Sequence, residues 1–287
     1  MPIWQHWILS HEIAVRLGCF ALVLMLMILW ETLLPRRQWH NPRPVRWLNN
    51  LGLALINNLL VRLLFPMAAV GVAAYAGQKG WGLLRVLSLP PPWEVLIAVV
   101  TLDLIIYLQH VMFHALPALW RLHRVHHADV DFDVTTGIRF HPLEILISLG
   151  IKAAAIVLLG APVVAVVIFE VLLNATAMFN HGNVYLPGAL DRVLRWLIVT
   201  PDMHRVHHSI ADDEANCNFG FNLPWWDRLL GTYRAQPRRG HERMTIGIHG
   251  IRQRRQVLWL PGVLLLPFSA PVTGYVINRR QGSRDEY

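Results

Sequence analysis

Long apolar stretches separated by short polar loops dominate this sequence. A helix needs about 20 apolar residues to cross the hydrocarbon core of a bilayer. Four stretches reach that length: 14–34, 51–76, 94–116 and 143–179. The last is too long for one span, and Gly160-Ala-Pro162 divides it into two short ones. The pattern predicts an all-α integral membrane protein, a transmembrane helical bundle of about four to six spans.

Two apolar segments depart from a simple span. In 51–76, Asn57, Asn58 and Arg62 interrupt the first half, which we expect to be tilted, buried against protein or lying in the interface. The stretch 256–277 contains three prolines, so a re-entrant or interfacial segment is at least as well supported there as a span. No basic region precedes the first stretch, which favours an uncleaved span over a signal peptide.

Composition supports a membrane protein and excludes several other classes. Hydrophobic residues are 54% of the chain and charged residues 15%, against about 25% charged in ordinary globular proteins. The formal net charge is +8, but arginines such as Arg43 and Arg46 lie next to apolar stretches. We interpret them, with Arg36 and Arg37, as juxtamembrane charge facing anionic lipid, and expect no nucleic-acid partner. The two cysteines can build neither a disulfide framework nor a cysteine zinc motif.

Basic residues in the first two loops orient the bundle. Residues 35–50 carry four arginines, whereas residues 77–93 carry one lysine and one arginine. The positive-inside rule therefore places the first loop in the cytoplasm. The third stretch then delivers His110 and His114 to the cytoplasmic face, and the divided hairpin returns the chain to that side. We expect a multi-pass protein of a bacterial inner membrane or of a membrane like the endoplasmic reticulum.

Two copies of one pentapeptide carry the candidate chemistry: His123-Arg-Val-His-His127 and His204-Arg-Val-His-His208. With 15 histidines in 287 residues, chance gives both copies in roughly one chain in a thousand. On a helix the first histidine of each copy meets the next two at i+3 and i+4, so we expect all three on one face. His110 and His114 share a face in the same way. Such spacing is typical of metal ligands.

Eight histidines are too many for one ion of about four to six ligands, so the motifs predict two ions. His181 follows the fifth segment on the cytoplasmic side and is the preferred ninth ligand. The predicted metal ligands are His110, His114, His123, His126, His127, His181, His204, His207 and His208. No side chain outside the metal centre is expected to react.

Further residues could bind metal or hold the second nitrogen of a ligating histidine. Asp103 lies seven residues before His110 on the same helical face, and an aspartate inside a span is costly enough to be a functional candidate. Tyr107 lies three residues before His110. The full set of such candidates is His141, His249, Asp103, Tyr107 and Asp227.

Three other interpretations of the histidines stay open at this point. The simplest is a solvated histidine-rich surface with no metal. A metal transporter is a second, although it would carry polar residues along its spans, whereas these histidines concentrate on one side. The third is a structural zinc-binding membrane protein without turnover, because imidazole suits iron, zinc, copper and nickel alike.

The combined motifs resemble the fatty acid hydroxylase / sterol desaturase superfamily of integral-membrane di-iron proteins. The resemblance covers about residues 103–233. It begins with Asp-x3-Tyr-x2-His-x3-His, which ends at His114, and continues with the first pentapeptide and Arg139-Phe-His-Pro-Leu-Glu144. His181, the block Met203-His-Arg-Val-His-His-Ser209 and the segment from Asn218 to Arg234 complete it.

The resemblance implies a cytoplasmic histidine-rich cap that holds two irons and uses O2 to hydroxylate or desaturate a C–H bond of a lipid. The implied substrate is a fatty acyl, sterol or other isoprenoid-type lipid from the bilayer. The electrons would come from a separate cytochrome b5, ferredoxin or reductase. We expect an N-terminal transmembrane region at 1–93, the catalytic region at 94–250, and an apolar segment with a basic tail at 251–287.

Overall fold

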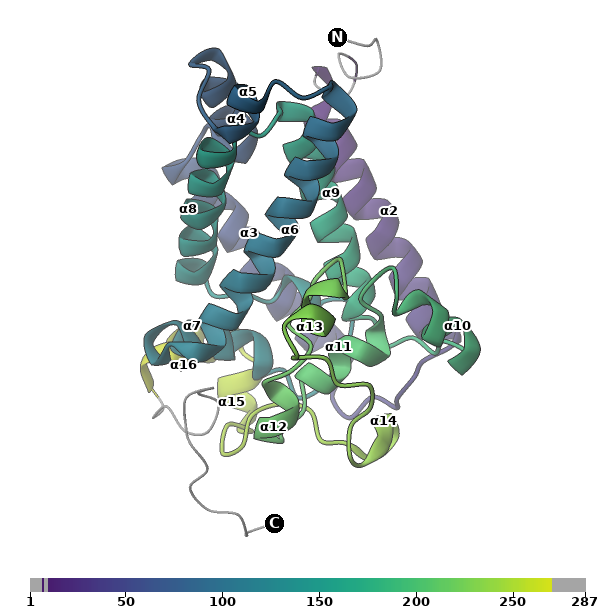
Figure 1. Ribbon diagram of the computed structural model, residues 1–287. Helices are drawn as coiled ribbons and strands as arrows, with labels where there is room; N and C mark the ends of the chain where they lie inside the picture. The colour runs from purple at the N-terminus through teal and green to yellow at the C-terminus, as the bar shows by residue number, and fades with distance from the viewer. Residues whose placement is uncertain (1–6, 8–9, 270–287) are drawn as a thin grey trace.

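Long apolar helices form the body of the protein. The computed structural model describes residue 7 and residues 10–269. In this part of the chain there are three isolated β-bridges and no β-strand. Five helical segments are long and apolar enough to cross a membrane, and they stand together as a bundle in Figure 1: α2 (Glu12–Leu33), α3 with α4 (Arg43–Gln78), α6 (Pro91–Ala115), α8 (Pro142–Leu159) and α9 (Val163–Asn180). The predicted all-α, multi-pass membrane fold is confirmed.

Short helices gather at one end of this bundle (Figure 1). We call this end the cap; it consists of α7, α10 to α15 and the loops that join them. Its helices are α7 (Pro117–His127), α10 (Gly188–Leu194), α11 (Pro201–His207), α12 (Asp212–Ala215), α13 (Trp225–Leu229), α14 (Gly240–Arg243) and α15 (Arg254–Val257). The short α5 (Leu83–Leu87) lies at the opposite end. A 3-10 turn, η1 (Thr136–Ile138), and α16 (Leu260–Ser269) complete the elements.

The second predicted span consists of two helices. α3 (Arg43–Leu64) begins eight residues earlier than the predicted start at 51, and α4 (Ala68–Gln78) follows a break at residues 65–67. Pro66 explains the break, because proline lacks an N–H and disfavours helix at the residue before it. Asn57 of α3 is buried, whereas Asn58 and Arg62 are exposed. Burial against protein therefore holds for one of the three polar residues that interrupt the predicted span.

The division of the long apolar stretch 143–179 into two helices is confirmed. Gly160 has φ +68° and ends α8, a conformation that glycine adopts at no steric cost. A Cβ there would lie 2.5 Å from the carbonyl oxygen of Trp81. Pro162 then caps α9. Because the chain reverses here, the two histidine pentapeptides lie at the same end of the bundle.

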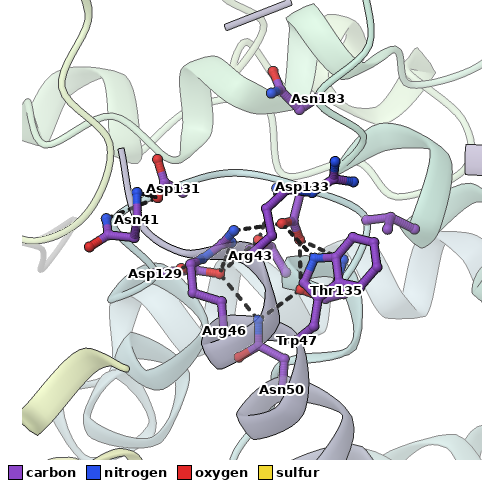
Figure 2. A network of polar contacts seen from close by, with 12 residues as sticks. Asn41, Arg43, Arg46, Trp47, Asn50, Asp129, Asp131, Asp133, Thr135 and Asn183 are labelled. Carbon is purple, nitrogen blue, oxygen red and sulfur yellow. Dashed lines mark hydrogen bonds and ion pairs between the residues drawn. The ribbon is translucent and has the colours of Figure 1, made fainter. Parts of the chain in front are cut away.

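Arginines of the first loop contact the cap, so their assignment to lipid is wrong for Arg36, Arg37 and Arg46. Arg46 is fully buried, with nitrogens 2.8 Å from Asp129 and 2.5 Å from Asp133 (Figure 2). Arg37 donates to the carbonyl of Met244 at 2.8 Å, and Arg36 pairs with Asp202 at 3.4 Å and Glu242 at 3.0 Å. The Arg46 contacts tie α3 to the segment that follows the first pentapeptide, and the other two tie the loop before α3 to α11 and to the region of α14.

The stretch 256–277 contains no spanning helix in its described part. α16 has ten residues, about 15 Å at 1.5 Å per residue, which is too short to cross a bilayer. Arg121 of α7 donates to the carbonyl of Pro267 at 3.1 Å, so α16 lies against the cap. Residues 270–277, like the basic tail that follows, lie outside the described residues.

Candidate metal centre

The nine predicted histidines come together in two adjoining groups. Each residue offers one ligand atom, and within a group these atoms lie within 4.8 Å of one another. Group 1 is His110, His114, His123, His127 and His207; group 2 is His126, His181, His204 and His208. All nine side chains are buried. His127 of group 1 stacks on His208 of group 2 with ring centroids 4.5 Å apart, so the groups share a boundary.

Local sequence places both pentapeptides on short helices. Pro117 opens α7 and Pro201 opens α11, each at the first helical turn, where the missing N–H of proline costs nothing. The side chain of Thr200 also accepts from the backbone N–H of Met203 at 3.3 Å. His110 and His114 come from the cap end of α6, and His181 is the C-cap of α9.

Each pentapeptide contributes histidines to both groups. In the first copy, His123 and His127 belong to group 1 and His126 to group 2. In the second, His204 and His208 belong to group 2 and His207 to group 1. In both copies the i, i+4 pair stays together and the third histidine reaches the neighbouring group.

Facing ring nitrogens lie close together inside each group. In group 1, the Nε2 atom of His110 is 3.1 Å from that of His123 and 3.0 Å from that of His207. The Nε2 atoms of His114 and His127 are 3.1 Å apart. In group 2, the Nε2 atom of His181 is 3.1 Å from those of His126 and His204.

Hydrogen bonds on the outer side fix the tautomer of four histidines. Three donate Nδ1–H to backbone carbonyls: His110 to Phe219 at 2.8 Å, His207 to Cys217 at 2.7 Å and His181 to Ala177 at 2.7 Å. His123 donates Nδ1–H to the Glu144 carboxylate at 2.6 Å. Because the proton sits on Nδ1, each Nε2 presents a lone pair to the interior of its group.

Burial keeps these imidazoles neutral. It lowers the pKa of His123 and His181 to about 3. Burial, with the neighbouring imidazoles as a smaller cause, lowers the pKa of the other cap histidines well below the ordinary value: His126, His127, His204, His207 and His208. Lone pairs 3.0 to 3.1 Å apart repel each other unless a cation lies between them. Since protonation is disfavoured, the donor set fits a metal ion.

Asp103, Tyr107 and Asp227 do not touch the histidines. Asp103 accepts from the indole N–H of Trp226 at 2.8 Å and therefore anchors α13 to α6. The Tyr107 hydroxyl lies 2.8 Å from that of Thr232, which donates to Asp227 at 2.6 Å. Asp227 also accepts from the backbone N–H of Phe219 at 2.8 Å. It thereby positions the residue whose carbonyl holds His110.

His141 and His249 lie outside both groups. His141 caps α8: its Nδ1 accepts from the backbone N–H of Leu143 at 3.2 Å, and its Nε2–H donates to the carbonyl of Leu264 at 3.2 Å. His249 is exposed. Neither residue belongs to a group that could hold metal among the described residues.

Sequence reasoning assigned no role to a buried polar network that supports the first pentapeptide. Arg139 donates to the carbonyls of Val125 and Val257 and to the side chain of Asn50, each at 2.8 Å. Asp129 lies two residues after His127 and pairs with Arg46 (Figure 2). Burial would raise the pKa of Asp129, but the charges of Arg46 and Arg139 outweigh it and hold that pKa below its ordinary value. In the sequence, the alternating acidic residues Asp129, Asp131 and Asp133 are the feature that could have indicated this network.

A cavity of about 330 Å³ leads from the histidines into the bundle. We call it the reaction cavity. His110 and His123 line its cap end, and its walls include apolar residues such as Ile106 and Phe221. Its far part holds ionic side chains: Glu170 lies 3.1 Å from Arg16 and also pairs with Lys152.

Comparison with known proteins shows a family resemblance. The fatty acid hydroxylase family model matches residues 95–232, a segment that contains all nine histidines and Glu144. This segment, just under half of the chain, is similar to the fatty acid hydroxylase family. The matched segment falls inside the predicted catalytic region 94–250, whose exact boundaries stay a prediction.

Several relatives of the chain carry the names of lipid-modifying enzymes. The chain is 28% identical to ornithine lipid hydroxylase OlsE of Rhizobium tropici, over 74% of this chain and 65% of that protein. It is 28% identical to human alkylglycerol monooxygenase over 54% of this chain and 34% of that protein. It is 25% identical to rat cholesterol 25-hydroxylase over 75% of this chain and 71% of that protein. The chain thus matches between one third and about two thirds of the length of the first two relatives, and no solved structure matches it.

Glu144 is expected to strengthen metal binding through His123. In Glu144→Ala the Nδ1–H of His123 loses its acceptor, and we expect metal affinity to fall about 10- to 100-fold. Glu144→Gln keeps a carbonyl oxygen as acceptor, so its metal affinity should fall less than that of Glu144→Ala. Competition with a chelator of known affinity measures both variants. Equal affinities for Glu144→Ala and the native protein would rule out this role.

Proposed function

We propose that this protein hydroxylates a membrane lipid with O2, using two iron ions held by group 1 and group 2. The observation that carries the proposal is the paired histidine groups, in which neutral Nε2 lone pairs face each other at 3.0 to 3.1 Å inside buried sites. The nine histidines of the two groups are the proposed ligands. Hydrogen bonds from their Nδ1 atoms hold four of these rings in the ligating orientation.

The number of ligands argues against a structural zinc site. Group 1 offers five histidines, one more than a tetrahedral site uses. Imidazole suits iron as well as zinc, copper and nickel, so the choice of iron rests on the family resemblance of residues 95–232.

The reaction cavity is the proposed binding site of the lipid substrate. When bound, two irons supply the redox chemistry by which O2 attacks an unactivated C–H bond. The cavity holds a lipid chain between the spanning helices and brings one carbon next to His110 and His123. Its apolar walls exclude water from that carbon. Hydroxylation consumes the lipid C–H, O2, two electrons and two protons, and gives a lipid alcohol and water.

The names of the relatives favour hydroxylation over desaturation. Ornithine lipid hydroxylase, alkylglycerol monooxygenase and cholesterol 25-hydroxylase are all named for insertion of oxygen. We further propose that the cap faces the cytoplasm, as the arginine-rich first loop predicts, and that a separate electron donor reaches the histidines from that side. The concentration of all nine histidines at one end of the bundle counts against metal transport.

Lipid profiling with a cavity variant tests the proposed function. Cells that express the protein should gain a lipid heavier by one oxygen atom. Ala54 of α3 lines the reaction cavity, and we expect Ala54→Phe to lower product formation about 10- to 100-fold by displacing the chain, while the protein keeps two iron ions. The matched control is Leu55→Phe, because the neighbouring Leu55 is exposed. Iron-loaded protein that oxidises no lipid with a competent reductant, or equal activity of both variants, contradicts the proposal.

A further inference from the structure

A second cavity, of about 530 Å³, lies on the outer side of the cap and carries excess positive charge. We call it the arginine cavity. Segments of α10, α11, α13 and α14 line it, together with the loop after α2. Four arginines line it against two carboxylates, which leaves a net charge of 4 − 2 = +2: Arg36, Arg192, Arg195 and Arg228 face Asp191 and Asp202. Such a surface attracts anions.

Arg195 is the buried anchor of this charge. Arg195 is only 4% exposed, and its Nε lies 2.7 Å from the Asp191 carboxylate. Its Nη1 donates to the carbonyl of Ala235 at 2.5 Å. The Tyr233 side chain is a further partner of this guanidinium, and no described acceptor meets hydrogen-bond geometry at its Nη2. An anionic oxygen would satisfy that buried N–H.

Arg228 is held rigid at the wall of the same cavity. Its guanidinium carbon lies 3.9 Å from the ring centroid of Trp196 and 4.0 Å from that of Tyr233. Its Nη2 donates to the carbonyl of Arg195 at 3.1 Å. Arg228 and Arg192 form no ion pair with a carboxylate of the described chain. Arg195 and Arg228 are therefore held in place, and their remaining donors, with those of the exposed Arg192, match the oxygens of a phosphate group.

A buried neutral histidine adds a further donor. His241 is 4% exposed and lines the arginine cavity, and neither ring nitrogen has a hydrogen-bond partner among the described residues. Burial lowers its pKa to about 3, although the charge of Asp202 works in the opposite direction. The ring is therefore neutral at neutral pH and can donate one N–H to an acceptor.

The rim of the arginine cavity is apolar and exposed. Val193, Trp196 and Leu197, at and just after α10, are 59% to 61% exposed, and Leu229 of α13 is 74% exposed. Both helices lie where the cap meets the spanning helices (Figure 1). Exposed tryptophan and leucine beside arginine are typical of the zone where lipid headgroups lie.

We propose that the arginine cavity binds the phosphate group of an anionic membrane phospholipid. Arg192, Arg195 and Arg228 offer the donors, whereas Arg36 is already paired with Asp202 at 3.4 Å and with Glu242 at 3.0 Å. The apolar rim contacts the acyl chains of the same lipid. The arginine cavity shares no lining residue with the reaction cavity, so the proposal does not rest on the proposed hydroxylation. The bound lipid is a second ligand, held apart from the lipid that reacts.

Native mass spectrometry of the full-length protein in detergent tests this site. The probes are phosphatidylglycerol and phosphatidylcholine with identical acyl chains, and inorganic phosphate. The test variant is Arg192→Gln/Arg228→Gln. Its matched control is Arg254→Gln/Arg255→Gln, which removes the same charge from two exposed arginines of α15 that do not line the cavity. Metal content of each variant reports whether the cap has folded, and Arg192→Gln alone replaces the double variant if it has not.

We expect the native protein and the control to retain one phosphatidylglycerol more tightly than phosphatidylcholine, and the test variant to bind it at least about tenfold more weakly. Equal retention of the two lipids by the native protein would overturn the proposal, as would equal binding by the test variant and the control. Displacement of the lipid by millimolar inorganic phosphate would assign the cavity to a soluble phosphate and overturn its assignment to a membrane lipid.

Discussion

Replacing His181 by alanine is expected to remove one of the two metal ions and to abolish most of the activity. The Nε2 atom of His181 lies 3.1 Å from those of His126 and His204, so this ring joins the histidines of the two pentapeptides within group 2. Without it, group 2 keeps three histidines. Group 1 contains no atom of His181 and should keep its ion.

We expect metal content to fall from two ions per chain to about one, and turnover to fall more than about 100-fold. Removing even a partner that only orients a ligand costs about 10- to 100-fold in metal affinity or activity, and His181 is a proposed ligand. Elemental analysis of purified protein and a product assay measure the two effects. His249→Ala is the matched control, because His249 is exposed and outside both groups. Two ions and native turnover in His181→Ala would exclude His181 as a ligand.

Replacing Arg46 by methionine is expected to destabilise the protein by about 3–5 kcal/mol. The fully buried guanidinium holds Asp129 at 2.8 Å and Asp133 at 2.5 Å, and both carboxylates are themselves buried (Figure 2). Removing one partner of a buried ion pair leaves uncompensated charge in a medium of low polarity. In Arg46→Met, two negative charges next to the first pentapeptide lose their main counter-charge.

The melting temperature of the purified protein should fall by about 10 °C. Arg62→Met is the control, because Arg62 lies on the same helix and is exposed. It should change the free energy of unfolding by about 0.5 kcal/mol or less. Adding Asp133→Asn to Arg46→Met should recover part of the loss, because it removes one unpaired charge. Equal melting temperatures for Arg46→Met and Arg62→Met would refute the role of the buried pair.

Periodicity and spacing identified the spans and the histidines. The length of apolar stretches is set by bilayer thickness, so the spanning helices could be located from composition alone. Gly160 and Pro162 act within their own turn, so the reversal between α8 and α9 could be predicted. Eight of the nine histidines could be named because i, i+3 and i+4 spacing is a property of one helix, and His181 could be named because it follows the fifth segment on the same side of the bundle.

Partners far apart in the sequence could not be identified in this way. Asp103 lies on the same helical face as His110. Its carboxylate nevertheless accepts a hydrogen bond from Trp226, which lies in the distant segment 218–234. Nothing local in the loop 35–50 distinguishes a lipid-facing arginine from Arg46, whose partners lie 83 and 87 residues away. Glu144 and the carbonyl of Phe219, which hold His123 and His110, likewise come from other elements.

The sequence by itself determined which histidines could bind metal and at which end of the bundle they lie. Only the tertiary structure decided how they divide into five and four, and that each pentapeptide serves both groups. The physical reason is that helical spacing fixes the direction of side chains relative to their own axis. The positions of α6, α7, α9 and α11 relative to one another depend instead on the buried contacts between them, and those contacts join segments that are distant in the chain.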